Sequence, residues 1–385
     1  MIVLSTGPVL AAAIAPIAGD SSHAIAARAN ANAPVLPAGF PAKLDADLAW
    51  VGSDFQKQSE YICQLDADDL IEVKAAVEQY KSLDQDGDLV EPQTFPLPTL
   101  GPELAALGRE VHYGKGFVVI RGIDPASYSV EDLTVVYLGV QSYIAEQRGR
   151  QDKRGNMLVH IVADNSTKQA AEHHRHSNQS ITFHNEEAGD VVSWLTRSTA
   201  AAGGKCIIAS SYTVYNVLAA TRPEVIRTLA RSDWPFALPH FHCRPVIFYQ
   251  DSKLVTNFGR AALLGNAAHP RPEHLPALTH RQIEALDAIE AIAKATQIEI
   301  QTQAGDMHFI NNLAILHRRE GFVDGEAATE KRHLVRMRLR SAEHGWSIPK
   351  ELTHEWDEAF NKGGVKHWHL EPMPSFFFPL RRQPN

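Results

Sequence analysis

The chain has 385 residues, of which 44% are hydrophobic, 8% aromatic and 21% charged, a composition typical of globular proteins and unlike that of fibrous or disordered chains. Lys and Arg number 37 and Asp and Glu 45, and this net charge of −8 argues against non-specific nucleic-acid binding, which depends on neutralising phosphates. Nineteen histidines stand against three cysteines, Cys63, Cys206 and Cys243, which are too few and too widely spaced for a disulfide framework or a Cys-based zinc site. We therefore expect a reducing, cytoplasmic location, and histidine and carboxylate as the ligands of any metal.

The first 41 residues are expected to form an N-terminal extension. Residues 2–18 are mostly apolar, but no Lys or Arg precedes Arg28, and Pro8 and Pro16 interrupt the run, so a signal peptide is disfavoured. No stretch reaches the ~20 uninterrupted apolar residues that a membrane-spanning helix needs. We expect no membrane partner.

The stretch from residue 66 to 147 favours helices around one short strand. Acidic residues at 66, 68 and 69 precede an amphipathic segment, where the helix dipole favours negative charge. Helices are expected over 70–83, 102–112 and 130–147, and a buried strand between the glycines of 116–122. Residues 151–181 are polar and lack periodicity, and irregular segments of that length are usually functional or mobile.

From Phe183 onward the pattern changes to short strands separated by turns. Strands are expected over 191–195, 206–210, 246–249, 253–256, 298–302, 307–311 and 333–339, and helices over 213–220 and 279–295. Asp251-Ser252 is typical of a tight hairpin turn between two of these strands. The order of elements predicts an α+β or mainly β fold, in which helices surround a double-sheet β core.

The sharpest local motif is Phe183-His184-Asn185-Glu186. Side chains of a strand alternate between its two faces, so His184 and Glu186 can present an imidazole and a carboxylate to the same point. With so many histidines in the chain, an H-x-E pair alone is weak evidence for a metal site.

Two later segments strengthen the metal hypothesis. His317 ends an apolar run, where a buried histidine facing a cavity is plausible, and Arg332 and Arg336 share one face of a following strand. The alternation of strand side chains places Arg338 and Arg340 on this face too, and for these two residues we favour a position on a solvated edge strand, where they form salt bridges. Two histidines and a carboxylate form the facial triad of non-haem Fe(II) oxygenases, and a guanidinium presents a planar fork of donors to a carboxylate.

Several separate motifs, which follow one another in the same order as in the taurine dioxygenase (TauD/TfdA-like) family, resemble those of that family, with the greatest likeness to its fungal branch. The resemblance covers about residues 95–350. It is carried by Gly116-Phe117-Val118-Val119-Ile120-Arg121-Gly122, Gly155-Asn156-Met157-Leu158-Val159-His160, Phe183-His184-Asn185-Glu186, Gly203-Gly204, Ala209-Ser210-Ser211-Tyr212-Thr213-Val214-Tyr215-Asn216, Gly305-Asp306, Phe309-Ile310-Asn311-Asn312, His317, Arg332 and Arg336.

The resemblance implies a double-stranded β-helix (jelly-roll) core with surrounding helices, and Fe(II), 2-oxoglutarate and O2 as cofactors and co-substrates. By motif position it makes His184, Glu186 and His317 the iron ligands. Arg332 would bind the C5 carboxylate of 2-oxoglutarate, and Arg336 would face the co-substrate or an anionic substrate.

Two positions depart from the family pattern. Glu186 stands where Asp is usual, which lengthens the reach of the carboxylate but keeps its charge, and Glu187 and Asp190 are rival ligands. We expect Glu187 to point to the opposite strand face and Asp190 to be structural. Cys206 stands where a Thr or Ser often assists the co-substrate carboxylate, and a thiol is a weak donor.

Other candidate residues surround these motifs. For the histidine cluster at 173–176 a solvated or substrate-lid loop is favoured over substrate or metal contact, and His308 and His333 are expected to pack in strands. The residues that we expect to line the substrate pocket are Ser177, Asn178 and Trp346, with Arg336.

These inferences predict an enzyme, a 2-oxoglutarate-dependent dioxygenase. It would oxidise an unactivated C–H bond of a small anionic or amino-acid-like molecule in fungal specialised metabolism, with hydroxylation as the default and desaturation or ring closure as alternatives. A zinc hydrolase using the same three ligands and a non-catalytic metal-binding jelly-roll protein stay open. The partners expected are a small-molecule substrate, no nucleic acid and, optionally, further copies of the chain.

The candidate ligands also bear on domain organisation. His184, His317 and Arg332 must meet at one iron, so at least residues 95–350 should form a single domain. We accordingly expect one domain over 42–385, with a C-terminal tail over 351–385.

Overall fold

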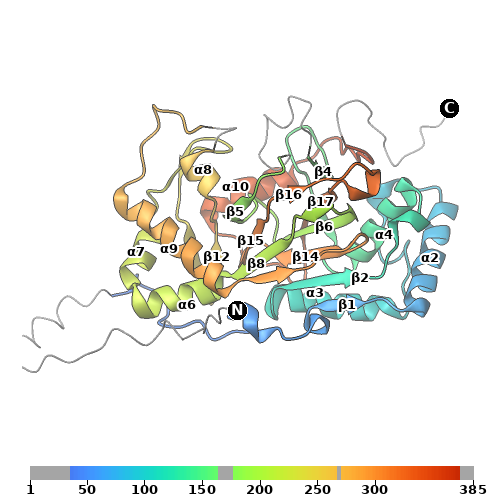
Figure 1. Ribbon diagram of the computed structural model, residues 1–385, viewed down its shortest axis with the longest axis horizontal. Coiled ribbons are helices and arrows are strands. Elements are labelled where there is room, and N and C mark those ends of the chain that lie inside the picture. The colour runs from blue at the N-terminus through green and yellow to red at the C-terminus, as the bar shows by residue number, and fades with distance from the viewer. Residues whose placement is uncertain (1–34, 164–176, 267–269, 373–385) are drawn as a thin grey trace, which may run out of the picture. The chain divides into compact units, whose positions relative to one another are not determined.

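The computed structural model describes residues 35–163, 177–266 and 270–372, and two β-sheets lie at its centre (Figure 1). The larger, seven-stranded sheet has the order β1-β2-β14-β6-β17-β3, and β4 also pairs with β17. Its strands are β1 (Ile62–Gln64), β2 (Phe117–Arg121), β3 (Gln147–Gly149), β4 (Val159–Val162), β6 (Val191–Ser198), β14 (Met307–Asn311) and β17 (His333–Arg340). The smaller sheet has the order β13-β8-β15-β5, formed by β5 (Ile181–His184), β8 (Cys206–Ser210), β13 (Ile298–Ile300) and β15 (Ile315–Arg319). The protein is thus a mixed α+β fold with several sheets.

Short two-stranded ladders accompany the two sheets. They are β7 (Ala202–Gly203) with β16 (Phe322–Val323), β9 (Pro235–Phe236) with β10 (His242–Cys243), and β11 (Ile247–Gln250) with β12 (Lys253–Thr256). Asp251 and Ser252, between β11 and β12, have φ of 48° and 59°, the left-handed conformation that a tight two-residue hairpin turn requires. The predicted hairpin is confirmed.

Helices contact the sheets in two groups (Figure 1). Near β2 and β14 are α2 (Ala67–Ser82), α3 (Leu100–Tyr113) and α4 (Val130–Ser142), and near β8 are α6 (Ser211–Thr221), α7 (Pro223–Leu229) and α9 (His280–Thr296). Two shorter helices are α8 (Arg260–Leu264) and α10 (Thr353–Trp356). Asp66 caps α2 by accepting from the backbone N–H groups of Asp68 and Asp69, and Thr279 caps α9, which explains where these helices begin. In the described part of the chain, no helix is long and apolar enough to span a membrane.

Apolar side chains form two buried clusters. One joins the smaller sheet to α6, α7 and α9 and contains Phe183 and Trp234, and the other joins the larger sheet to α2, α3 and α4 and contains Tyr137 and Phe309. The described residues from Leu36 onward form one compact unit. The boundary predicted near residue 41 stays a prediction.

Most predicted elements are confirmed within a few residues, and three expectations are corrected. The helix expected over 130–147 ends at Ser142, where the Gln141 side chain donates to the Ala145 carbonyl at 2.7 Å and closes the turn before β3. The stretch 151–181, expected to be irregular, contains β4, whose four residues are too few to show a strand pattern in the sequence. The strand β17 is interior, because β6 pairs with it on one side and β3 and β4 on the other, so Arg338 and Arg340 do not lie on a solvated edge.

Candidate metal centre and co-substrate cavity

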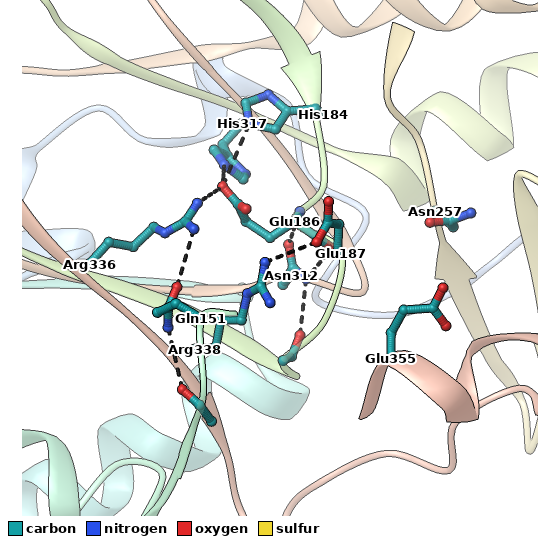
Figure 2. A network of polar contacts seen from close by, with 12 residues as sticks. Gln151, His184, Glu186, Glu187, Asn257, Asn312, His317, Arg336, Arg338 and Glu355 are labelled. Carbon is teal, nitrogen blue, oxygen red and sulfur yellow. Dashed lines mark hydrogen bonds and ion pairs between the residues drawn. The ribbon is translucent and has the colours of Figure 1, made fainter. Parts of the chain in front are cut away.

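Three side chains meet where β5 and β15 pair (Figure 2). His184 ends β5 and lies opposite His317 in the register of the two strands, and Glu186 follows two residues after His184. Their candidate ligand atoms all lie within 4.8 Å of one another. The Nε2 atoms of both imidazoles are 3.8 Å from Oε1 of Glu186. The structure therefore brings together the three residues proposed as ligands.

The residue between the first two ligands explains their common direction. Asn185 points to the other face, where its Nδ2 donates to the carbonyls of Asn312 (2.7 Å) and Ile315 (3.0 Å) and its Oδ1 accepts from the Phe258 N–H (3.1 Å). Sequence reasoning missed this role, although a polar residue between two candidate ligands was the available signal.

The imidazoles are held in a form suited to bind a metal. The Thr182 carbonyl can only accept, so Nδ1 of His184, 2.9 Å away, carries a proton, and Nε2 is the ring nitrogen that faces Glu186. Burial and the neighbouring His184 lower the pKa of His317 to about 4, so its imidazole is neutral near pH 7. Metal ligation requires this neutral form.

The donor set fits a divalent transition metal. Two imidazole nitrogens and one carboxylate form the arrangement that leaves open coordination positions on Fe(II). Within the described ranges, no other group of three His, Cys, Asp or Glu side chains converges in this way.

The two rival carboxylates lie in other interactions. Glu187 forms an ion pair with Arg338 at 3.3 Å. Asp190 accepts from Trp356 Nε1 at 2.7 Å and lies 3.7 Å from Arg340, and burial raises the pKa of Asp190 to about 6. Neither belongs to the convergent group. Arg338 is thus paired with an exposed carboxylate, and the half-buried Arg340 lies beside the buried Asp190.

Arg336 makes the most direct contact with the triad (Figure 2). Its Nη1 forms an ion pair with Oε1 of Glu186, and its Nη2 donates to Oε1 of Gln151 at 3.2 Å. The arginine side chain is buried, and it is the cation that balances the buried carboxylate. Gln151, which positions it, has no sequence signal that singles it out.

A cavity of about 180 Å³ opens onto the triad, and the predicted co-substrate residues are in its wall. Arg332, Arg336 and Cys206 all line it, together with Trp194. The guanidinium of Arg332 lies over the Phe322 ring at 5.3 Å, and although burial lowers its pKa to about 10, it stays protonated near pH 7. Burial raises the pKa of the Cys206 thiol to about 12, so this group is a neutral thiol.

The three residues suggested as further substrate contacts are not in the wall of this cavity. The Ser177 carbonyl accepts from Arg319, the Asn178 carbonyl accepts from the Phe322 N–H, and Trp346 is buried with its indole N–H donating to the His112 carbonyl. The histidine cluster at 173–176 lies outside the described residues. Both His308, stacked on Trp194, and His333 lie in strands, as expected.

Comparison with known proteins gives a consistent family. Residues 79–338 match the model of the taurine catabolism dioxygenase TauD, TfdA family. The chain is 32% identical over 384 residues to the taurine hydroxylase-like protein SAT17 of Stachybotrys chartarum, covering 96% of this chain and 99% of the relative. It is 24% identical over 323 residues to FR-33289 synthase of Streptomyces rubellomurinus, covering 80% and 93%.

Solved structures agree with this fold. Asparagine oxygenase in complex with Fe(II), 2S,3S-3-hydroxyasparagine and succinate matches with a TM-score of 0.57 at 17% identity, covering 73% of this chain and 94% of that chain. The non-haem iron oxygenase OrfP in complex with Fe and α-ketoglutaric acid matches with a TM-score of 0.54 at 15% identity, covering 73% and 93%. Because the family model matches about two thirds of the chain and one relative is 32% identical along almost its full length, the chain belongs to the TauD/TfdA family of 2-oxoglutarate-dependent dioxygenases.

Proposed function

We propose that this protein uses Fe(II), 2-oxoglutarate and O2 to oxidise an unactivated C–H bond of a small anionic or amino-acid-like molecule in specialised metabolism. Hydroxylation is the default outcome, with desaturation or ring closure as alternatives. The observation that carries the proposal is that His184, Glu186, His317 and Arg332 line one cavity. The wall of this cavity thus offers a metal-binding triad and a buried cation.

We also propose that the two central sheets form the two halves of a double-stranded β-helix. Pairing in both sheets is antiparallel, apart from β1 with β2. His184 and His317 lie on strands of the smaller sheet and Glu186 follows the end of one of them, whereas the strand that carries Arg336 belongs to the larger sheet. A cavity between two such sheets is a common place for a ligand in barrel-like folds.

In this proposal His184, Glu186 and His317 hold the iron, and Arg332 holds the far carboxylate of 2-oxoglutarate. When bound, iron with 2-oxoglutarate and O2 supplies the oxidising power for C–H cleavage, while the co-substrate leaves as succinate and CO2. Arg336 forms an ion pair with the Glu186 carboxylate and so holds it beside the two histidines. The buried Trp194 lines the cavity and excludes water from it.

The substrate class rests on charge and on the relatives. Arg336 supports an anionic group on the substrate, since its Nε has no hydrogen-bond partner among the described residues. One relative is called taurine hydroxylase-like, and the solved structures contain 3-hydroxyasparagine or L-Arg, which are amino acids.

A screen of amino acids, sulfonates and small carboxylates, read out as substrate-dependent conversion of 2-oxoglutarate to succinate, tests this proposal. We expect coupled turnover with at least one compound, dependence on Fe(II) and O2, and a rise of at least ~30-fold in the 2-oxoglutarate requirement of Arg332→Ala, since a charge-assisted contact contributes ~2 to 3 kcal/mol. A zinc hydrolase would act without O2 and would be indifferent to loss of Arg332. That result would overturn the proposal.

A further inference from the structure

A second, polar cavity of about 130 Å³ adjoins the cavity at the triad. The residues that line both cavities are Trp194, Cys206, Arg332 and Leu334. The rest of its wall comes mainly from 198–205 and from Thr196, Gln301 and Thr302. Arg332 therefore stands at the boundary between the two spaces.

Two buried polar atoms in this wall have no hydrogen-bond partner among the described residues. They are Oγ1 of Thr196, whose residue is 1% exposed, and Nη1 of Arg332. The backbone of Thr196 is satisfied, because its N–H donates to the Asp306 carbonyl (2.9 Å) and its carbonyl accepts from the Gly305 N–H (2.7 Å). A buried hydroxyl without a partner costs ~1 to 3 kcal/mol, so such groups usually meet a ligand or water.

Strand geometry points the Thr196 hydroxyl toward the co-substrate region. Thr196 and Trp194 are two residues apart in β6 and so lie on the same face, and Thr196 is opposite Leu334 in the register with β17. Both Trp194 and Leu334 line the two cavities. Trp194 is fixed in turn by stacking on His308, with ring centroids 4.9 Å apart.

Two other donors of this wall, Lys205 and Cys206, are already paired or weak. Lys205 forms an ion pair with Glu299 at 2.8 Å. Cys206, beside Arg332, offers only a thiol, which is a weak hydrogen-bond donor. Among the hydroxyls of this wall, that of Ser198 donates to the Lys331 carbonyl and those of Thr199 and Thr302 belong to half-buried residues, whereas that of Thr196 is buried and has no partner among the described residues.

We propose that Thr196 is a co-substrate-binding residue, whose hydroxyl donates to the far carboxylate of 2-oxoglutarate beside the Arg332 guanidinium. This inference rests on the proposed function and adds a residue to its co-substrate site. Hydrogen bonds to an ionised acceptor are stronger than neutral ones, so the Thr196 contribution should appear as selectivity for a 2-oxo acid with a second carboxylate.

The test compares two ligands on the full chain loaded with Mn(II), by calorimetric titration without turnover. The ligands are 2-oxoglutarate and 2-oxopentanoate, which has the same carbon chain but lacks the far carboxylate. The ratio of their dissociation constants isolates recognition of that carboxylate from metal chelation. We expect the preference for 2-oxoglutarate to fall about tenfold in Thr196→Val and to stay near wild type in Thr196→Ser.

Ser193 provides a matched control on the same strand. Its hydroxyl is also buried, but it faces away from the cavity and bonds to the Tyr137 hydroxyl at 2.9 Å, so Ser193→Ala should lower thermal stability and leave the ligand preference unchanged. An unchanged preference in Thr196→Val, or in Thr196→Ala if the valine variant does not fold, would overturn the role of Thr196. A wild-type protein with no preference for 2-oxoglutarate would overturn the proposed function as well.

Discussion

The side chain of Asn312 brackets the backbone of Glu186: its Oδ1 accepts the Glu186 N–H at 2.7 Å, and its Nδ2 donates to the Glu186 carbonyl at 3.0 Å. The same Nδ2 also lies 3.0 Å from the Gly189 carbonyl. Glu186 follows the end of β5 and has no ladder partner of its own, so this bracket replaces the sheet as its support. The position of the carboxylate ligand therefore depends on a residue just after β14.

Loss of the bracket should weaken metal binding. In Asn312→Ala the Glu186 N–H loses its partner and the ligand backbone is freed, and removal of such supporting hydrogen bonds typically lowers metal affinity 10- to 100-fold. We expect a drop in this range when Co(II) is titrated against a competing chelator. Asn361→Ala is the control, because that amide bonds to Asp357 outside the cavity wall. Equal affinity in both variants would exclude a supporting role for Asn312.

The identity of the carboxylate ligand can be tested by shortening or removing the Glu186 side chain and by removing the neighbouring Glu187 side chain. Glu186→Asp should keep partial succinate production, because the charge remains although its reach is one methylene shorter. Glu186→Ala should abolish production. Glu187→Ala should retain it, since Glu187 pairs with Arg338 instead. Full activity of Glu186→Ala would assign the ligand to another acid, with Asp190 next to be examined.

Asp190 should make the protein less stable as the pH rises. Burial raises its pKa from 3.8 to about 6, so between pH 4 and 6 the folded state binds more protons than the unfolded state, and stability falls as the pH increases. The loss is at most about 3 kcal/mol, from a shift of about two pKa units. Asp190→Asn keeps an acceptor for Trp356, and we expect it to be more stable than wild type at pH 7 in urea unfolding. A similar difference between the two proteins at pH 4 and pH 7 would contradict this account.

The histidine pair His160 and His333 should have the opposite effect, so that the protein becomes less stable as the pH falls. Nε2 of His160 lies 2.6 Å from the His369 carbonyl, so it donates there, and Nδ1 accepts from Nε2 of His333 at 2.8 Å. Burial lowers the pKa of His160 to about 4 and that of His333 to about 2. The unfolded state binds more protons below about pH 6.5, so the contribution of the pair is complete above that pH and is lost as the pH falls toward 4.

His160→Gln isolates this effect. The glutamine can still donate to the His369 carbonyl but does not titrate, so the free energy of unfolding should decline less steeply between pH 6.5 and 4.5 than in wild type. Parallel pH profiles for the two proteins would show that His160 does not contribute to acid sensitivity.

The sequence could predict the triad because its chemistry follows local rules. Alternation along a strand places His184 and Glu186 on one face, and the apolar run before His317 predicts its burial. The other strands follow from runs of apolar residues bounded by turns, the amphipathic helices follow from apolar residues at helical spacing, and most of their bounds agree with the structure.

The features of the site that the sequence could not predict depend on contacts between residues far apart along the chain. Gln151 reaches Arg336 across 185 positions, and Asn312 reaches Glu186 across 126, and no local pattern encodes either bond. Arg338 was expected on a solvated edge, because alternation along a strand cannot reveal that β3 pairs with β17 at this position. Trp346 was expected to line the substrate pocket, whereas it is buried with its N–H directed to the His112 carbonyl and is not in the wall of the cavity at the triad.

The central claim is that His184, Glu186 and His317 bind Fe(II) and leave room for 2-oxoglutarate to chelate it. The most direct measurement is the visible spectrum of the anaerobic protein with Fe(II) and 2-oxoglutarate. We predict the weak charge-transfer band of a chelated complex in wild type and its loss in His184→Ala. Absence of the band in wild type, or an undiminished band in His184→Ala, would contradict the account.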